Sequence, residues 1–267
     1  MRQAMAAAAV GDDGYHEDPT VTRLEALSAR MLGKDAALYM PSGTMSNLVA
    51  ALTHCTTEQR VVLMTNSHIG WTLTYDSRVT PLVSLTMIPD SGRGIAAADD
   101  IRAALAPIDG KEAGLLCIEN SHNLAGGSAL RPDETGTMTA VAHDLGAPVH
   151  LDGARIFNAS VALGIPASEL AADVDSVTFC LSKGLGAPIG SVLCGSTEFI
   201  EQARVHRQYV GGTMRQAGIV AAATRGRWPD KLISAVTLST ISLPAFVVGY
   251  IAMFLLAVEF RVFPSVS

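Results

Sequence analysis

Short apolar runs alternate with amphipathic stretches along most of this chain, and this rhythm constrains the fold more than any other feature. It runs from Gly11 to about Ala223. Such alternation is typical of βα units around a largely parallel sheet, because each strand needs a helix to return the chain to the same end of the sheet. With 49% hydrophobic residues among 267, the chain can also bury a substantial core. We therefore predict an α/β fold with a mostly parallel sheet between helices.

The chain beyond residue 223 breaks this rhythm. No charged residue lies between Lys231 and Glu259, and the segment 232–258 is long enough to cross a bilayer as a helix at about 1.5 Å per residue. A buried core helix is the alternative, but such helices seldom run so long without a charge. We predict a first domain at 1–223 and a hydrophobic tail at 224–267, with a transmembrane helix at 232–258. Basic residues before this helix place the first domain in the cytoplasm, with membrane anchoring by the tail.

Charge and cysteine content exclude several classes of function. The formal net charge of -6 argues against a nucleic-acid surface, which needs clustered Lys and Arg. The four cysteines are far apart and predict neither a zinc knuckle nor a disulfide framework. No His or acidic pair has ligand spacing on one helix, so no metal site is predicted. The first ten residues are alanine-rich rather than a secretory leader, which again favours the cytoplasm. A small molecule is the expected partner.

Polar or glycine residues follow each predicted strand, where open α/β sheets build their ligand sites. The predicted strands are 36–40, 61–64, 114–118, 148–151 and 176–181. After the first of them, Ser42, Gly43 and Thr44 precede an apolar helix, whose N-terminus offers free N–H groups to a phosphate. Any βα connection needs such a turn, so the feature alone leaves both interpretations open. His68 and His122 follow the next two strands, where a solvated or capping histidine is the alternative to a catalytic one.

The last two predicted strands end in charged residues. Asp152 closes one strand with Arg155 three residues later, an arrangement that an ion pair would also explain. Lys183 emerges from the other strand among serine and glycine rather than among surface charges. A lysine desolvated at a strand end loses proton affinity and becomes a usable amine nucleophile, as Schiff-base chemistry with a carbonyl cofactor requires. A surface lysine at a turn is the alternative.

Six blocks of sequence, in this order, resemble the signatures of the threonine aldolase family of aromatic amino acid beta-eliminating lyases and threonine aldolases. The blocks are 11–20, 41–45, 119–123, 150–155, 181–188 and 211–216. The resemblance covers about 1–223. It implies a fold-type I enzyme dependent on pyridoxal 5′-phosphate (PLP), with a PLP-dependent transferase-like large domain and a mixed, mostly parallel sheet. Family members form homodimers or homotetramers with active sites at subunit interfaces.

The resemblance also implies roles for individual residues. Lys183 would form the Schiff base with the cofactor, and Asp152 would pair with the pyridine nitrogen to keep the ring an electron sink. The other implied cofactor contacts are Arg155 to the phenolic oxygen, Ser42, Gly43 and Thr44 to the phosphate, and His68 stacked on the ring. His122 would lie near the substrate hydroxyl, while Arg215 and Tyr15 would reach a neighbouring subunit's site.

The implied reaction is retro-aldol cleavage of a β-hydroxy amino acid, threonine or allo-threonine, to glycine and an aldehyde. The base that takes the hydroxyl proton would be His68, His122 or a water they hold. A β-eliminating enzyme and an inactive PLP-binding paralogue are alternatives within the family.

Three departures from the family pattern set this chain apart. Met1 stands after the point where family members carry a substrate-binding Ser-Asp-Thr stretch, and 69–76 lacks the acidic-Gly-Gly run common after the stacking histidine. Beyond residue 223 the small domain that supplies the substrate-carboxylate arginine is missing. Instead, 225–231 and 241–249 resemble a peptide-type ABC transporter permease, so a membrane-associated transporter fragment is a further alternative. A natural fusion or an artefact joining two pieces would produce this junction, and we favour the artefact. We expect the chain to bind PLP better than it cleaves threonine.

Overall fold

The computed structural model describes residues 1–56, 58–74 and 84–224, which belong to one compact unit. Within these residues no helix combines the length and apolar character needed to span a bilayer. The predicted transmembrane helix at 232–258, and with it the hydrophobic tail at 224–267 apart from its first residue, lies outside the described residues.

The described residues build a seven-stranded sheet in the order β1-β7-β6-β5-β4-β2-β3. Every pair among β2 to β6 that lies side by side is parallel, whereas β7 is antiparallel to both of its neighbours, β1 and β6. Six strands therefore point the same way, and their carboxyl ends meet at one edge of the sheet. The strands are β1 (Ala36–Met40), β2 (Arg60–Met64), β3 (Ser84–Ile88), β4 (Ala113–Glu119), β5 (Val149–Asp152), β6 (Ser176–Cys180) and β7 (Ser191–Gly195).

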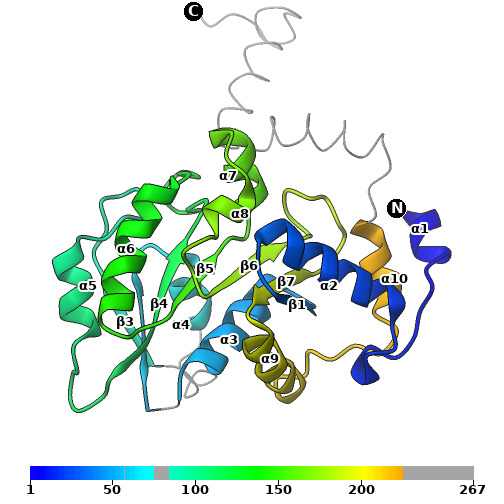
Figure 1. Cartoon of the computed structure of the whole chain (residues 1–267), viewed down its shortest axis with the longest axis horizontal. Helices are drawn as coiled ribbons and strands as arrows, with labels where there is room; N and C mark the ends of the chain where they lie inside the picture. Colours follow the sequence, from blue (N-terminus) through cyan, green and yellow to red (C-terminus); the bar gives the residue numbers. More distant parts are fainter. Residues whose placement is uncertain (57, 75–83, 225–267) are drawn as a thin grey trace, which may run out of the picture. The chain divides into compact units, whose positions relative to one another are not determined.

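Helices lie on both sides of this sheet (Figure 1). Side chains of α2, α5, α6, α7 and α8 pack on one face, and those of α3, α4 and α9 pack on the other. The helices are α1 (Arg2–Ala6), η1 (Asp13–Tyr15), α2 (Pro19–Leu32), α3 (Gly43–His54), α4 (His68–Thr74), α5 (Ala98–Leu105), α6 (Pro132–Asp144), α7 (Ile156–Leu163), α8 (Ala167–Leu170), α9 (Thr197–Tyr209), α10 (Gly218–Ala221) and η2 (Ala222–Thr224).

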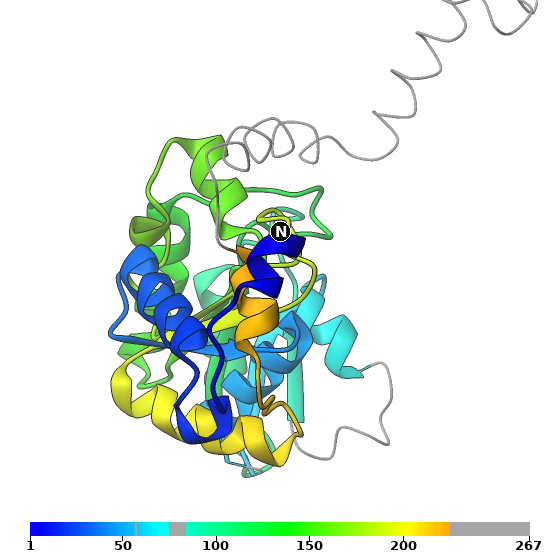
Figure 2. The ribbon, with the colours of Figure 1, turned by 90° about the vertical axis from the view of Figure 1, so that its right-hand side faces the viewer.

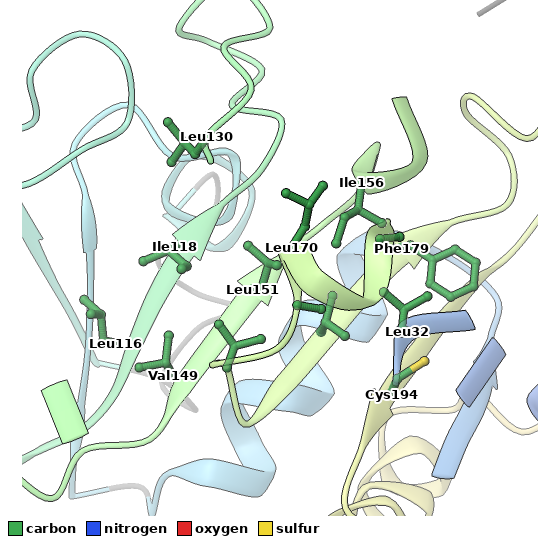
Figure 3. Close-up of a cluster of buried hydrophobic side chains, with 14 of the residues drawn as sticks. Leu32, Leu116, Ile118, Leu130, Val149, Leu151, Ile156, Leu170, Phe179 and Cys194 are labelled. Atoms are coloured by element: carbon green, nitrogen blue, oxygen red, sulfur yellow. The ribbon is translucent and has the colours of Figure 1, made fainter. Parts of the chain in front are cut away.

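Alternation along each strand decides which side chain joins which core. In β4, Leu116 and Ile118 join the large cluster beneath α2, α5, α6 and α8, whereas Leu115 and Cys117 face α3 and α4. Figure 3 shows part of this large cluster, with leucine, isoleucine and valine side chains of β4 and β5 and Leu170 of α8 among its members. Strands that are apolar on both faces are expected where helices cover a parallel sheet on both sides.

The two central strands β5 and β6 are apolar on one face only. Val149 and Leu151 join the large cluster, so the alternate residues His150 and Asp152 point to the α3 side. In β6 the alternate residues on that side are polar or thiol-bearing as well. They are Ser176, Thr178 and Cys180. The long helix α3, which contacts β1, β4, β5, β6 and β7, therefore covers a buried polar strip in addition to two smaller apolar clusters.

The N-terminal segment is tied to the end of the described chain. Asp18 is 1% exposed, caps α2 by accepting hydrogen bonds from the N–H groups of Thr20 and Val21, and accepts another from Gly218 of α10 at 2.8 Å. Asp13 forms a buried ion pair with Arg207 of α9, at 2.9 Å. In Figure 2 helix α1 lies beside α10, and the two helices are in contact. The N-terminal segment is therefore packed against the last helices of the described chain.

The structure confirms the predicted α/β class and the mostly parallel sheet. All five predicted strands exist, with boundaries within one residue of the prediction. The strands β3 and β7 were not predicted, and β7 is the one that makes the sheet mixed. Helix α3 follows β1 as predicted, but it begins at Gly43, so Gly43 and Thr44 form its first turn rather than precede it.

Candidate active site

The polar residues that follow the strands come together because six carboxyl ends share one edge of the sheet. Ser42 follows β1, His68 follows β2, Asp152 ends β5 and Lys183 follows β6. Open α/β sheets bind their ligands at this edge. The predicted convergence of these four residues is therefore a result of strand direction and order.

A cavity of about 310 Å³ lies at this edge, within the size range of small-molecule sites. Asp152 and Lys183 both line it, so the carboxylate and the amine face one space. The described residues that line the cavity are Pro41, Ser42, Gly43, Thr44, Asn47, His68, Asp152, Ala154, Cys180, Ser182, Lys183, Pro188, Ile189 and Gly190.

The N-terminus of α3 forms one wall of this cavity. Ser42 is the N-cap, and its Oγ accepts a hydrogen bond from the N–H of Met45 at 3.2 Å. The N–H groups of Gly43 and Thr44 have no partner among the described residues, so they are free to bind an anion. A Cβ on residue 43 would lie 2.6 Å from Sγ of Cys180. Glycine at this position therefore lets the helix start close against the end of β6.

Asp152 is the only carboxylate among the described residues lining the cavity. It is 1% exposed, and two donors hold it in place: Nδ2 of Asn47 binds Oδ2 at 2.8 Å and the N–H of Ala154 binds Oδ1 at 3.1 Å. Both donors fix the orientation of the carboxylate. A cationic ring nitrogen in the cavity would find its counter-ion here.

Lys183 lies in the loop that joins β6 to β7 and is half-buried. The loop is closed by main-chain hydrogen bonds from Leu181 and Ser182 to the carbonyl of Gly190, at 3.0 and 3.2 Å. The carbonyl of Lys183 in turn accepts a bond from Gly186 at 3.0 Å. These bonds fix the shape of the loop, from which Lys183 lines the cavity.

His68 lines the cavity at the start of α4, and its main chain is held by Glu119 at the end of β4. Glu119 is 4% exposed; its Oε2 accepts a hydrogen bond from the N–H of His68 and its Oε1 accepts one from Asn123, both at 2.8 Å. Burial, together with the nearby charge of Asp152, raises the pKa of Glu119 to about 7. Burial lowers the pKa of His68 below its usual value. A neutral imidazole at this position can stack on a ring or accept a proton.

Four predicted site residues lie outside the lining of the cavity as described. His122 is fully buried, and its Nδ1 accepts a hydrogen bond from Ala125 at 3.3 Å. Arg155 donates to Oδ1 of Asn123 at 3.0 Å. Arg215 pairs with Asp12 and sits over the ring of Tyr15, 5.8 Å from the ring centroid. Their predicted roles remain predictions.

Sequence reasoning assigned no role to Asn47 or Glu119. Asn47 lies one turn into a helix that is mostly apolar on its buried side, and an amide at such a position is the signal that could have found it. Glu119 occupies the last position of a buried strand, in register with Asp152 of the next strand. A carboxylate at that place in an apolar strand is a comparable signal.

The buried imidazoles of His150 and His54 should make the protein less stable in acid. Burial lowers the pKa of His150 to about 3 and that of His54 to about 4, whereas both titrate near 6.5 in an unfolded chain. Below pH 6.5 the unfolded chain binds protons that the folded chain refuses, so the free energy of unfolding falls as the pH falls. Glu119 acts in the opposite sense, since its raised pKa makes folding less favourable as the pH rises from about 4.5 to 7.

We therefore expect His54→Gln to reduce this acid sensitivity. Between pH 6 and pH 5, urea titrations should show that the free energy of unfolding falls by ~1 kcal/mol more in the wild type than in the variant. This is close to the change expected when the unfolded chain binds one more proton than the folded chain. Because Glu119 is present in both proteins, its opposing effect cancels. Equal pH dependence in the two proteins would show that His54 is not buried in its neutral form.

Comparisons with known proteins show the family of this chain. Residues 1–256 match the model of the family described as beta-eliminating lyase. Low-specificity L-threonine aldolase 1 of Arabidopsis thaliana is 42% identical over 228 residues, covering 84% of this chain and 64% of the relative. The low specificity L-threonine aldolase of Escherichia coli strain K12 is 39% identical over 225 residues, covering 84% and 67%.

A solved structure shows the same architecture. The putative aromatic amino acid beta-eliminating lyase/threonine aldolase from Exiguobacterium sp. 255-15 superposes with a TM-score of 0.70 at 26% identity, over 84% of this chain and 62% of that one. Fold and site together define an α/β protein with a candidate active site at the carboxyl edge of the sheet. The chain belongs to the beta-eliminating lyase family, which confirms the family predicted from the six sequence blocks.

The matches also bear on the extent of the family region. The family model runs to residue 256, beyond residue 223 where the resemblance was expected to end. It thus takes in most of the segment 232–258, and these matches give no support to the permease resemblance. The chain spans 64% and 67% of the length of the two curated relatives described above.

Proposed function

We propose that this chain binds pyridoxal 5′-phosphate and cleaves a β-hydroxy amino acid, threonine or allo-threonine, into glycine and an aldehyde. The observation that carries the proposal is the convergence of Lys183 and Asp152, from two neighbouring strands, on one cavity. The curated relatives named low-specificity L-threonine aldolase support the substrate class.

The residues of the cavity fit the cofactor group by group. Lys183 offers the amine for its aldehyde, and Asp152, held by two N–H donors, offers a counter-ion for its ring nitrogen. The free N–H groups of Gly43 and Thr44, with the hydroxyl of Ser42, suit its phosphate. His68 suits stacking on its ring. When bound, the cofactor supplies an electron sink for the electrons of the broken Cα–Cβ bond.

The chain's own residues then have distinct tasks. Asp152 would hold a proton on the ring nitrogen of the bound cofactor, and Lys183 would be the amine that holds the cofactor's aldehyde carbon and gives up this position to the amino group of the substrate. The substrate hydroxyl must lose a proton, and of the two predicted histidines His68 is the one that lines the cavity. Its lowered pKa leaves it neutral near pH 7, so we propose that His68, or a water it holds, accepts this proton. His122, enclosed near Glu119, would act only after a rearrangement of its loop.

Arg155 would reach the phenolic oxygen of the cofactor by leaving its contact with Asn123. The two residues are held together by one hydrogen bond of 3.0 Å between an exposed amide and the guanidinium. Breaking such a contact costs about 1.5 to 3 kcal/mol at most, which a new charge-assisted bond to a phenolate oxygen would offset.

The proposal also covers the oligomeric state of the chain and its location in the cell. We propose a homodimer or homotetramer in which Tyr15 and Arg215 of one subunit serve the neighbour's site, because both are exposed and already in contact. The division between 1–223 and 224–267, and membrane contact through 232–258 of an otherwise cytoplasmic chain, rest on the uncharged run in the sequence.

Product analysis tests the proposed reaction. The purified full chain, supplied with PLP, is incubated separately with L-threonine, L-allo-threonine and a β-substituted alanine. We expect acetaldehyde and glycine in equal amounts from at least one threonine isomer, and little pyruvate from the alanine derivative. Pyruvate without aldehyde would replace the proposal with β-elimination, and bound cofactor without either product would indicate an inactive paralogue.

A further inference from the structure

We infer that Asn47, His150, Ser176 and His54 form a hydrogen-bond relay of one fixed direction that positions Asp152 against the ring nitrogen of the cofactor. The relay residues touch neither cofactor nor substrate and are positioning residues. This inference rests on the proposed function for the role of Asp152, whereas the relay itself is a property of the protein alone.

The four residues form an unbroken line beneath the cavity. Nδ2 of Asn47 lies 2.8 Å from Oδ2 of Asp152, and Oδ1 of Asn47 lies 3.1 Å from Nε2 of His150. Nδ1 of His150 lies 2.8 Å from Oγ of Ser176, which lies 2.7 Å from Nε2 of His54. Asn47, His150 and Ser176 are each 4% exposed or less. The line crosses from α3 to β5 and β6 and back to the last turn of α3.

The carboxylate at one end sets the direction of every bond. Asn47 donates through its amide nitrogen to Asp152, which leaves its carbonyl oxygen to accept from Nε2 of His150. A neutral imidazole has one N–H, so Nδ1 of His150 accepts from the hydroxyl of Ser176. With that proton committed, the oxygen of Ser176 accepts from Nε2 of His54. Burial keeps both rings neutral by lowering the pKa of His150 to about 3 and that of His54 to about 4.

This direction matters because all the dipoles point the same way. Each group presents its positive end toward Asp152, and hydrogen bonds aligned in a chain strengthen one another in a buried setting. The relay thereby holds the amide of Asn47, and through it the carboxylate of Asp152, in one orientation. The relay also prevents rotation of Asn47, because its amide would lose both partners if it turned over.

Packing alone does not require these residues. Neighbouring strands fill the same face of the sheet with apolar side chains, Leu115 and Cys117 in β4 and Leu193 in β7. Buried polar residues in place of such groups rarely add stability by themselves. Their alignment on Asp152, the one carboxylate among the described residues that line the cavity, is the feature that a purely structural role leaves unexplained.

The same layer contains a matched control. Ser191 of β7 faces α3 as Ser176 does, is equally buried at 0% exposure, and forms a hydrogen bond of 2.6 Å with Ser46. That pair has no bond to the relay among the described contacts. Removing either hydroxyl therefore leaves a similar small gap, and only the loss at Ser176 breaks the line to Asp152.

The test compares Ser176→Ala, Ser176→Thr and Ser191→Ala in the full chain. Without the Ser176 hydroxyl, His150 can carry its proton on either nitrogen, so Asn47 is no longer fixed. We expect the Kd for PLP, from absorbance titration, to rise about tenfold in Ser176→Ala, equivalent to ~1.4 kcal/mol. Ser191→Ala should stay within about twofold of the wild type, and Ser176→Thr, which keeps a hydroxyl, should recover most of the affinity.

Two NMR measurements separate this inference from the proposed function. In the cofactor-free chain we expect His150 to carry its proton on Nε2, and with ¹⁵N-labelled PLP we expect the ring nitrogen to lose protonation at a lower pH in Ser176→Ala than in Ser191→Ala. A proton on Nδ1 of His150, or equal behaviour of the two alanine variants, would overturn the relay. Failure of the wild type to bind PLP would overturn the proposed function, while the His150 tautomer would still decide the direction of the relay.

Discussion

Lys183→Ala should abolish both attachment of the cofactor and cleavage of the substrate. Lys183 is the only lysine among the described residues that line the cavity. The variant therefore has no primary amine to form the covalent bond with the PLP aldehyde. We expect activity to fall by at least ~10⁴-fold, the scale associated with removing a covalent nucleophile. The visible absorbance of protein-bound PLP should disappear, although PLP held by its phosphate could remain weakly associated.

Lys34→Ala is the matched control for this experiment. Lys34 is also half-buried and donates to the carbonyl of Val174, but it lines a different cleft beside α2 and α9. The variant should keep the absorbance and activity of the wild type, apart from a modest loss of stability. A Lys183→Ala variant that still carried covalently bound PLP would place the attachment elsewhere.

Asp152→Asn should give the second largest effect. Without the carboxylate, none of the described residues lining the cavity can hold a proton on the ring nitrogen by charge. The electron sink weakens, and we expect kcat to fall by ~10² to 10³-fold, as when one preorganised electrostatic group is removed. KM should change less, because the groups that bind the phosphate remain. Cleavage rates and absorbance spectra across pH would measure both effects.

Glu119→Gln is the natural comparison for Asp152→Asn. Glu119 is the register partner of Asp152 in the adjacent strand and is almost as buried, but it does not line the cavity. Glutamine keeps one acceptor for the main chain of His68 or Asn123, so we expect a loss of less than about tenfold. Equal losses in the two variants would mean that Asp152 acts through folding rather than through the ring nitrogen.

The sequence predicted the parts of the fold that carry strong local patterns. Apolar runs such as 36–40 and 61–64 are long enough to mark a strand, and the abrupt polar residue after each run marks its carboxyl end. Strand β7 was not predicted because Ser191–Gly195 follows a loop rich in glycine and proline, which obscures where a short strand begins. Strand β3, only partly buried, has no such contrast with its surroundings.

In the candidate site, too, the residues at strand ends could be predicted and those in turns could not. Ser42, His68, Asp152 and Lys183 were predicted because residues at strand ends are placed by the sheet itself. His122 stands four residues beyond the predicted end of its strand, in a turn that points its ring inward against Gly94. The direction of a side chain in such a turn depends on tertiary contacts, which no local pattern encodes. Asn47 was missed for a related reason, since its role depends on which strands α3 crosses.

Reduction of the PLP-loaded full chain with borohydride, followed by peptide mapping, tests the central claim most directly. The reagent fixes the cofactor to the nitrogen that holds it. We expect a single modified peptide that carries the pyridoxyl group on Lys183. Modification of another lysine, or an unmodified chain after reduction in excess PLP, would contradict it.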